Sequence, residues 1–197
     1  MLTLFQHQRK SLAPAFNFRV VKNLYPLFWK KSSEMVSLIR QEIDSKTAAG
    51  NPPTVDIDDW AGRVGLDIIG HGGFGSDFSS LSHPNTPLNT AYRTSFVPDG
   101  KAALIFMLSM LTYPPLVRML PLKKNAQVRE GVSTVTAYLS DLIGRRKSDM
   151  YFNVDNPDYF EKIGQKDIIS SAMKSNAFSI EALVAQSKTL LGAGHET

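Results

Sequence analysis

The amino-acid sequence predicts an all-α, predominantly helical fold with little or no sheet. In most segments apolar residues recur at spacings of three and four, which is the period of an amphipathic helix. Residues that cap helices stand before several of these segments, whereas strand signals are thin, the stretch Val55-Asp56-Ile57 being the best of them. No long linker divides residues 1–197, so we expect a single domain.

Five helices are expected from the apolar periodicity, and each has one apolar face with polar residues between its members. In chain order these faces are Met35, Leu38, Ile39 and Ile43; Trp60, Ala61, Val64 and Ile68; Val128, Val132, Val135, Leu139 and Leu142; Ile168, Ile169, Ala172 and Met173; and Ile180, Leu183, Val184, Leu190 and Leu191.

The starts of three of these helices are marked by residues suited to the positive end of a helix. Asp56, Asp58 and Asp59 precede the second apolar face, where carboxylates favour the helix dipole. Asp167 is expected to cap the fourth helix and Ser179 the fifth, because their side-chain oxygens accept from backbone N–H groups of the first turn.

The charge balance argues against a nucleic-acid partner. Lysine and arginine number 22 against 18 aspartate and glutamate, a formal net charge of +4, and the basic residues do not gather in one segment. The short runs Lys30-Lys31, Lys123-Lys124 and Arg145-Arg146-Lys147 are interpreted as solvated helix faces or ends. The last run is expected to end the helix around Leu142, where cations suit the dipole.

Cysteine is absent, which excludes a disulfide, a thiolate metal site, an iron–sulfur cluster and a cysteine nucleophile within these residues. The four histidines form no i, i+4 pair, so no metal ligands are predicted. No secretory signal or transmembrane segment is expected. The longest apolar stretch, residues 102–111, is shorter than the roughly 20 residues of a spanning helix and soon reaches Pro114-Pro115.

A glycine-rich segment, Gly70 to Gly75, fits the string G-x-G-x-x-G of dinucleotide-binding loops. That chemistry needs a strand before the glycines and a helix after them, and here a helix precedes them and a polar loop follows. We therefore interpret the segment as a glycine-rich helix exit followed by a turn.

The last residues of the chain allow two interpretations. The final amphipathic helix leads into the small residues Gly192, Ala193 and Gly194, and then to an acid, Glu196, and an alcohol, Thr197. One interpretation is a frayed helix end. The other is a helix widened beside a bound ligand, with the carboxyl and hydroxyl groups placed to relay protons.

Four stretches of the chain resemble the cytochrome P450 family, in its fungal form. They follow one another along the chain in the same order as in the family. The ending AGHET at 193–197 matches the start of the family's distal helix, and QRKSLAPAF at 8–16 matches its R-K-x-L-x-P-x-F stretch. WAGRVGLDIIGHGGFGSDF at 60–78 and KDIIS at 166–170 match two elements between them. The resemblance covers almost the whole chain and implies a partial cytochrome P450 fold.

By resemblance, the cofactor is haem and the activity is that of a monooxygenase, an oxidoreductase that inserts one oxygen atom of O2 into a small apolar substrate. Arg9 would pair with a haem propionate, because a guanidinium matches a carboxylate. Ala193 and Gly194 would line the oxygen side of the haem, and Glu196 and Thr197 would be the acid–alcohol pair of proton delivery. An NADPH-dependent reductase is the implied partner. The implied location is the endoplasmic reticulum membrane, with contact through residues 102–119.

The sequence also departs from the family pattern. Phe5 stands where the family has tryptophan or histidine, and the cysteine-bearing haem loop is not among these residues, so they hold no iron ligand. We therefore expect a fragment that ends inside the distal helix and is inactive by itself. Two alternatives remain: a non-catalytic helical interaction or membrane-surface module anchored by residues 102–122, and a truncated gene model.

Overall fold

The structure, a computed structural model, describes residue 6 and residues 9–96, 123–153, 167–175 and 177–196. Within these ranges it contains helices and turns but no strand, which confirms the all-α prediction. The elements are η1 (Ala13–Phe16), α2 (Phe18–Asn23), α3 (Tyr25–Ala48), α4 (Ile57–Phe74), α5 (Pro87–Phe96), α8 (Lys123–Phe152), α10 (Ile168–Lys174) and α11 (Ile180–Glu196). Ile57 opens a helix, so the suggested edge strand at residues 55–57 is wrong.

The two predicted caps, Asp167 and Ser179, are confirmed, and Asp56, expected only as one of the acids near the start of its helix, is a cap as well. The Asp56 side chain accepts from the Asp59 N–H at 3.1 Å and starts α4. Asp167 accepts from the Ser170 N–H at 2.7 Å and starts α10. Before α11 the Ser179 hydroxyl oxygen accepts from the N–H of Ala182. Each bond satisfies a backbone donor that has no partner inside the helix.

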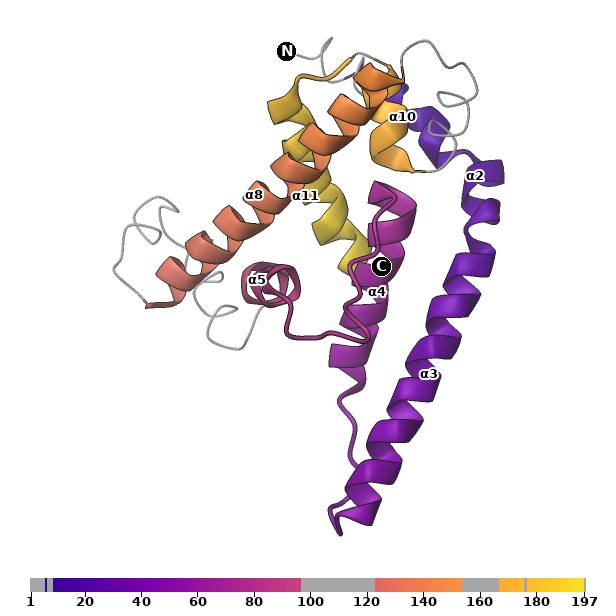
Figure 1. Cartoon of the computed structure of the whole chain (residues 1–197), viewed down its shortest axis with the longest axis vertical. Coiled ribbons are helices and arrows are strands. Elements are labelled where there is room, and N and C mark those ends of the chain that lie inside the picture. Colours follow the sequence, from indigo (N-terminus) through magenta and orange to yellow (C-terminus); the bar gives the residue numbers. More distant parts are fainter. Residues whose placement is uncertain (1–5, 7–8, 97–122, 154–166, 176, 197) are drawn as a thin grey trace.

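The core lies where α4, α5, α8 and α11 meet. Figure 1 shows α11 between α4 and α8, and it packs against both of them, while α5 packs against α8. The best-buried members of this cluster include Leu66 and Phe74 of α4, Tyr92 of α5, Leu139 of α8 and Leu191 of α11. The second to fifth predicted helices therefore supply the core, together with α5, since Ile169 and Ala172 of α10 belong to the same cluster.

Helices α2 and α3 form a long arm that lies along one side of α4 (Figure 1). The predicted apolar face of α3 is only half-buried against α4. A second stripe of apolar side chains on α2 and α3 is exposed, with Phe18 at 74% and Trp29 at 78% exposure. One face of the arm therefore carries apolar side chains that nothing in the described fold covers.

Helix α8 is longer than predicted. It continues to Phe152, so Arg145-Arg146-Lys147 does not end it. Near its other end α8 crosses α5 closely at Gly131, where a Cβ atom would lie 2.8 Å from the Ala91 carbonyl oxygen. Only glycine permits this distance between the two helices without displacing backbone.

The glycine-rich segment is a helix exit, as predicted. Helix α4 continues through it to Phe74, and Gly75 follows with φ +59°, in the left-handed region that favours glycine. The N–H of Gly75 bonds to the His71 carbonyl and that of Ser76 to the Gly70 carbonyl, which closes the helix end.

Several predictions fall on residues outside the described ranges. These are the apolar segment 102–119, Phe5 and Thr197. None of the helices in the described ranges has the length and apolar character that crossing a membrane requires.

Candidate functional site

Arg9, the residue predicted to meet a carboxylate of the cofactor, is exposed and belongs to a helical turn just before η1. η1 packs against α10 and α2. The guanidinium therefore stands at a surface, where an incoming carboxylate can reach it.

The predicted small-residue stretch lies at the other end of the chain, in the last turn of α11. Ala193 is exposed and Gly192 is half-buried, and the backbone of Gly194 and Glu196 continues the helix. Figure 1 shows the C-terminal end of α11 beside α4, away from the N-terminal end of the chain. Arg9 and Ala193 are both open to solvent, so the described residues do not enclose a ligand between them.

The donor atoms present do not by themselves fit a haem held by a thiolate. The sequence contains no cysteine. In the described ranges, histidine and carboxylate side chains nowhere gather as a set of three that would hold a metal ion. A haem beside Arg9 and Ala193 would therefore need its thiolate ligand from residues other than these 197.

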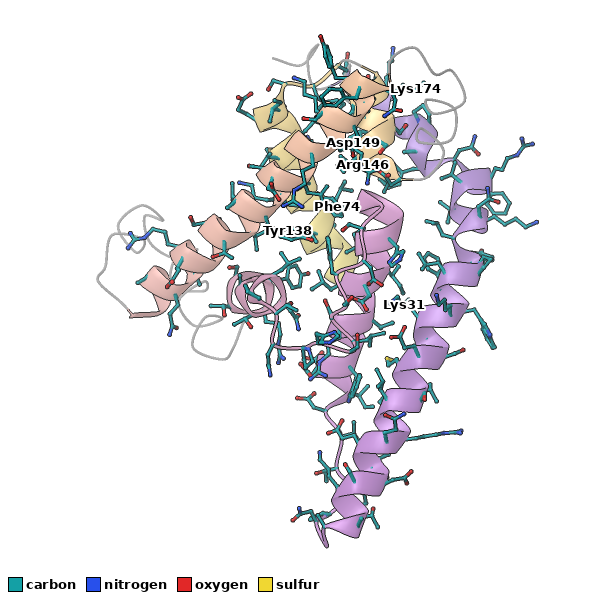
Figure 2. All side chains as sticks on the ribbon, in the orientation of Figure 1. Lys31, Phe74, Tyr138, Arg146, Asp149 and Lys174 are labelled. Carbon is teal, nitrogen blue, oxygen red and sulfur yellow. The ribbon has the colours of Figure 1, made fainter. Side chains whose placement is uncertain are left out.

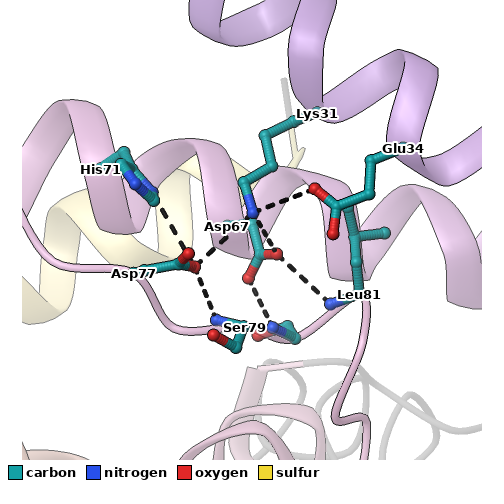
Figure 3. Close-up of polar contacts among 8 residues, drawn as sticks. Lys31, Glu34, Asp67, His71, Asp77, Ser79 and Leu81 are labelled. Carbon is teal, nitrogen blue, oxygen red and sulfur yellow. Dashed lines mark hydrogen bonds and ion pairs between the residues drawn. The ribbon is translucent and has the colours of Figure 1, made fainter.

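The structure reveals a buried polar cluster that the sequence analysis missed, shown in Figure 3. Lys31 of α3 is only 5% exposed, and its Nζ atom lies 3.3 Å from Asp67 Oδ2. The same atom is 3.3 Å from Glu34 Oε2 and 3.6 Å from Asp77 Oδ1. The interpretation of Lys30-Lys31 as a solvated helix face is therefore wrong for Lys31.

Asp67 of α4 is the centre of this cluster and is fully buried. Its Oδ1 atom accepts from the Ser80 N–H at 2.6 Å and its Oδ2 atom from the Leu81 N–H at 3.3 Å. Burial lowers the pKa of Lys31, but the carboxylates of Asp67, Asp77 and Glu34 together outweigh this and hold that pKa above its usual value. The cluster therefore joins α3, α4 and the loop after α4 through a charged pair.

A second polar cluster centres on Arg146 of α8, which points towards α10 and the end of α4 (Figure 2). Its Nη2 atom donates to the Phe74 carbonyl at 3.0 Å. Its Nη1 atom donates to Asp167 Oδ2 and to Ser170 Oγ, each at 3.1 Å. Arg146 thus ties three helices together, so the interpretation of this basic run as a solvated helix end is wrong for Arg146.

A small cavity of about 50 Å³ lies between α4 and α5. It is lined by Asp56, Asp58, Asp59, Gly62, Arg63, Asn89, Tyr92 and Arg93. Asp59 forms ion pairs with both arginines there. The volume suits a few water molecules and is too small for an organic substrate.

One polar contact links α5 to the predicted small-residue stretch. The hydroxyl group of Tyr92 donates to the Leu191 carbonyl oxygen at 3.0 Å, directly before Gly192. The two residues are 99 positions apart and no local pattern joins them, so this contact is not predictable from the sequence.

Comparison with known proteins gives a consistent result along the whole chain. The family model for cytochrome P450 matches residues 4–197. Cytochrome P450 monooxygenase FUM15 of Gibberella moniliformis is 36% identical over 195 residues, which cover 96% of this chain and 32% of that protein. Cytochrome P450 monooxygenase sphH of Aspergillus fumigatus is 38% identical over 192 residues, 96% of this chain and 34% of the relative.

A third relative, cytochrome P450 monooxygenase ALT8 of Alternaria alternata, is 32% identical over 207 residues, again 96% of this chain and 34% of the relative. The chain thus spans about a third of the length of these curated relatives. All three are fungal proteins, in agreement with the resemblance found in the sequence.

Proposed function

Because the chain belongs to the cytochrome P450 family, we propose that it forms the part of a haem-thiolate monooxygenase that contains the distal helix and the cover over the substrate. The observation that carries this proposal is the family match along residues 4–197. We further propose that residues 1–197 belong to one domain of that enzyme, since the described core joins helices from both halves of the chain.

Residues at the two ends of the chain have the chemistry that such a cofactor needs. Arg9 binds a haem propionate, for which its exposed guanidinium is suited. Ala193 and Gly194 leave room above the cofactor, because neither has a side chain beyond Cβ. Glu196 and Thr197 hold and move protons between this room and water.

When bound, a haem thiolate supplies the activation of dioxygen, and one oxygen atom enters a small apolar substrate. The thiolate comes from residues outside these 197, which contain no cysteine. The 197 residues alone are therefore inactive. Electrons come from an NADPH-dependent reductase. The enzyme lies at the endoplasmic reticulum membrane, with contact through residues 102–119.

The test begins with the transcript that contains these codons. The longer reading frame it provides and the 197-residue chain are expressed separately, supplied with haem, reduced and treated with carbon monoxide. We expect a thiolate-type Soret band from the longer protein and none from the 197-residue chain. A thiolate-type band from the chain alone, or a longer reading frame that gives no such band, would overturn the proposal.

The role of Arg9 is tested in the longer protein by Arg9→Leu, with its exposed neighbour as the matched control in Lys10→Leu. We expect haem to be lost faster from the Arg9 variant than from the control. Equal haem retention in the two variants would remove Arg9 from the proposed site.

A further inference from the structure

The hydrogen bond between Tyr92 and Leu191 joins α5 to α11 in the middle of the core. The hydroxyl oxygen of Tyr92 lies 3.0 Å from the Leu191 carbonyl oxygen, and the two residues are 1% and 0% exposed. Water therefore does not compete for this carbonyl, and a buried bond of this kind contributes more to local order than an exposed one.

The Leu191 carbonyl lies directly before the glycine-rich last turn of α11, so the Tyr92 bond bears on the order of that turn. In a regular α-helix this carbonyl accepts from the N–H four residues later, at residue 195. The residues between them include Gly192 and Gly194, and glycine weakens a helix interior relative to alanine. The helix is thus intrinsically weak directly after the carbonyl that Tyr92 holds, although α11 stays helical to Glu196.

Tyr92 is itself held firmly by its surroundings. Its ring belongs to the core cluster with Leu66 and Leu139. Helix α5 cannot shift easily, because Gly131 brings α8 against the Ala91 backbone. The neighbouring Arg93 forms an ion pair with Asp59 of α4. The Tyr92 hydroxyl therefore has a well-defined position in the core, and its hydrogen bond fixes the Leu191 carbonyl near the end of α11.

We propose that Tyr92 is a positioning residue: it fixes the Leu191 carbonyl and thereby sets where the small-residue turn of α11, Gly192 to Gly194, begins. The bond acts through the Leu191 carbonyl, so the proposed role of Tyr92 is to position α11 and not to take part in catalysis directly. Its effect on turnover rests on the proposed function. Its effect on the order of α11 does not.

The positioning is tested in the full-length protein with Tyr92→Phe, which removes the hydroxyl and keeps the ring. The matched control is Tyr138→Phe, because the Tyr138 ring of α8 packs edge-on against Phe78 in the same core. Hydrogen exchange of the amides of residues 192–196 is measured by mass spectrometry. We expect about fivefold faster exchange in the Tyr92 variant, as for the loss of one buried hydrogen bond, and no change in the control.

Equal exchange in the wild type and in Tyr92→Phe would overturn the positioning role. The effect on turnover is measured by comparing haem-loaded Tyr92→Phe with the haem-loaded wild type. We expect the variant to release a larger fraction of the O2 that it reduces as hydrogen peroxide. The absorption band of the reduced, carbon-monoxide-treated protein should stay unchanged. An unchanged peroxide share would overturn the link to turnover. If wild-type protein lacks the thiolate band, the proposed function fails instead, while the exchange comparison still decides the role of Tyr92.

Discussion

Asp67 and Asp167 are both buried aspartates paired with a cation, yet they stabilise the fold over different ranges of sequence. Asp167 accepts from the N–H and hydroxyl of Ser170, three residues away, and Arg146 completes its pairing. The cation that pairs with Asp67 is Lys31, 36 residues earlier, and its N–H partners are more than ten residues later.

The difference shows which buried charges a sequence reveals. Asp167 belongs to a local motif, a cap followed by an apolar helix, so its position was predictable. Asp67 stands inside a helix between apolar residues, and its partners come from another helix and a loop. The buried ion pair between α3 and α4, Lys31 with Asp67, has a long sequence separation, and the Trp60–Glu42 hydrogen bond is a second polar contact between these helices. The junction of α4, α8 and α10 is held by a cap, an arginine and a backbone carbonyl.

The strongest test of this contrast is Lys31→Met. It leaves Asp67 buried without its cation, which should lower the free energy of unfolding by about 3–5 kcal/mol, measured by chemical denaturation. The matched control is Lys30→Met at the exposed neighbour, expected to change it by less than about 0.5 kcal/mol. Equal effects at the two lysines would show that the buried pair does not stabilise the α3–α4 junction.

The second test is Arg146→Gln, which shortens the side chain that ties α4, α8 and α10. We expect a loss of about 2–3 kcal/mol in the free energy of unfolding, because Asp167 and the Phe74 carbonyl each lose a charged donor. Arg145→Gln removes only an exposed pair with Asp141 and should cost less than about 1 kcal/mol. A loss larger than that of Lys31→Met would reverse the proposed order of the two junctions.

A third test compares two glycines with positive φ. Gly75→Ala adds a Cβ that would lie 2.6 Å from Asp167 Oδ2 and 2.9 Å from Arg146 Nη2, so the cluster must shift. Gly50→Ala meets nothing within 4 Å and carries only the cost of its conformation, about 1 kcal/mol. We expect Gly75→Ala to lower the free energy of unfolding by about twice as much as Gly50→Ala, measured by thermal unfolding. Equal losses would mean that the Arg146 cluster adapts freely.

The smallest expected effect is a pH dependence at the outer end of the α3–α4 junction. Hydrogen bonds from Lys46 and Trp60 hold the pKa of Glu42 below its usual 4.5. The carboxylate therefore stabilises the fold above the unfolded-chain pKa, and this contribution is lost as pH falls through the lower, folded pKa. Glu42→Gln should thus cost more free energy of unfolding at about pH 7 than at about pH 3. A cost independent of pH would contradict this assignment.

The sequence was sufficient for elements whose signals are local. The helical periods, the caps Asp167 and Ser179, and the exit at Gly75 all lie within a few residues of what they determine. The end of α8 was missed, because charge at residues 145–147 suggests a terminus while tertiary contacts of Arg146 carry the helix onward. The same reason explains Lys31, whose burial depends on a partner that no spacing rule identifies.

The candidate site divides in the same way. Arg9, Ala193, Gly194, Glu196 and Thr197 came from the resemblance to a family, not from spacing, and their roles stay predictions. Tyr92 came only from the structure, because a bond between residues 99 positions apart has no signature in the sequence.

The two tryptophans differ in burial, so intrinsic fluorescence can report on the packing of α3 against α4. Trp29 is 78% exposed, whereas Trp60 is 7% exposed. The Trp60 indole N–H donates a hydrogen bond to Glu42, and Arg63 Cζ lies 4.7 Å from the centre of the Trp60 ring. Iodide should quench the fluorescence of the first indole and spare that of the second. Separation of α3 from α4 would expose Trp60 to iodide. The quenching of Trp60 in an unlabelled sample therefore measures the opening of the α3–α4 junction in real time.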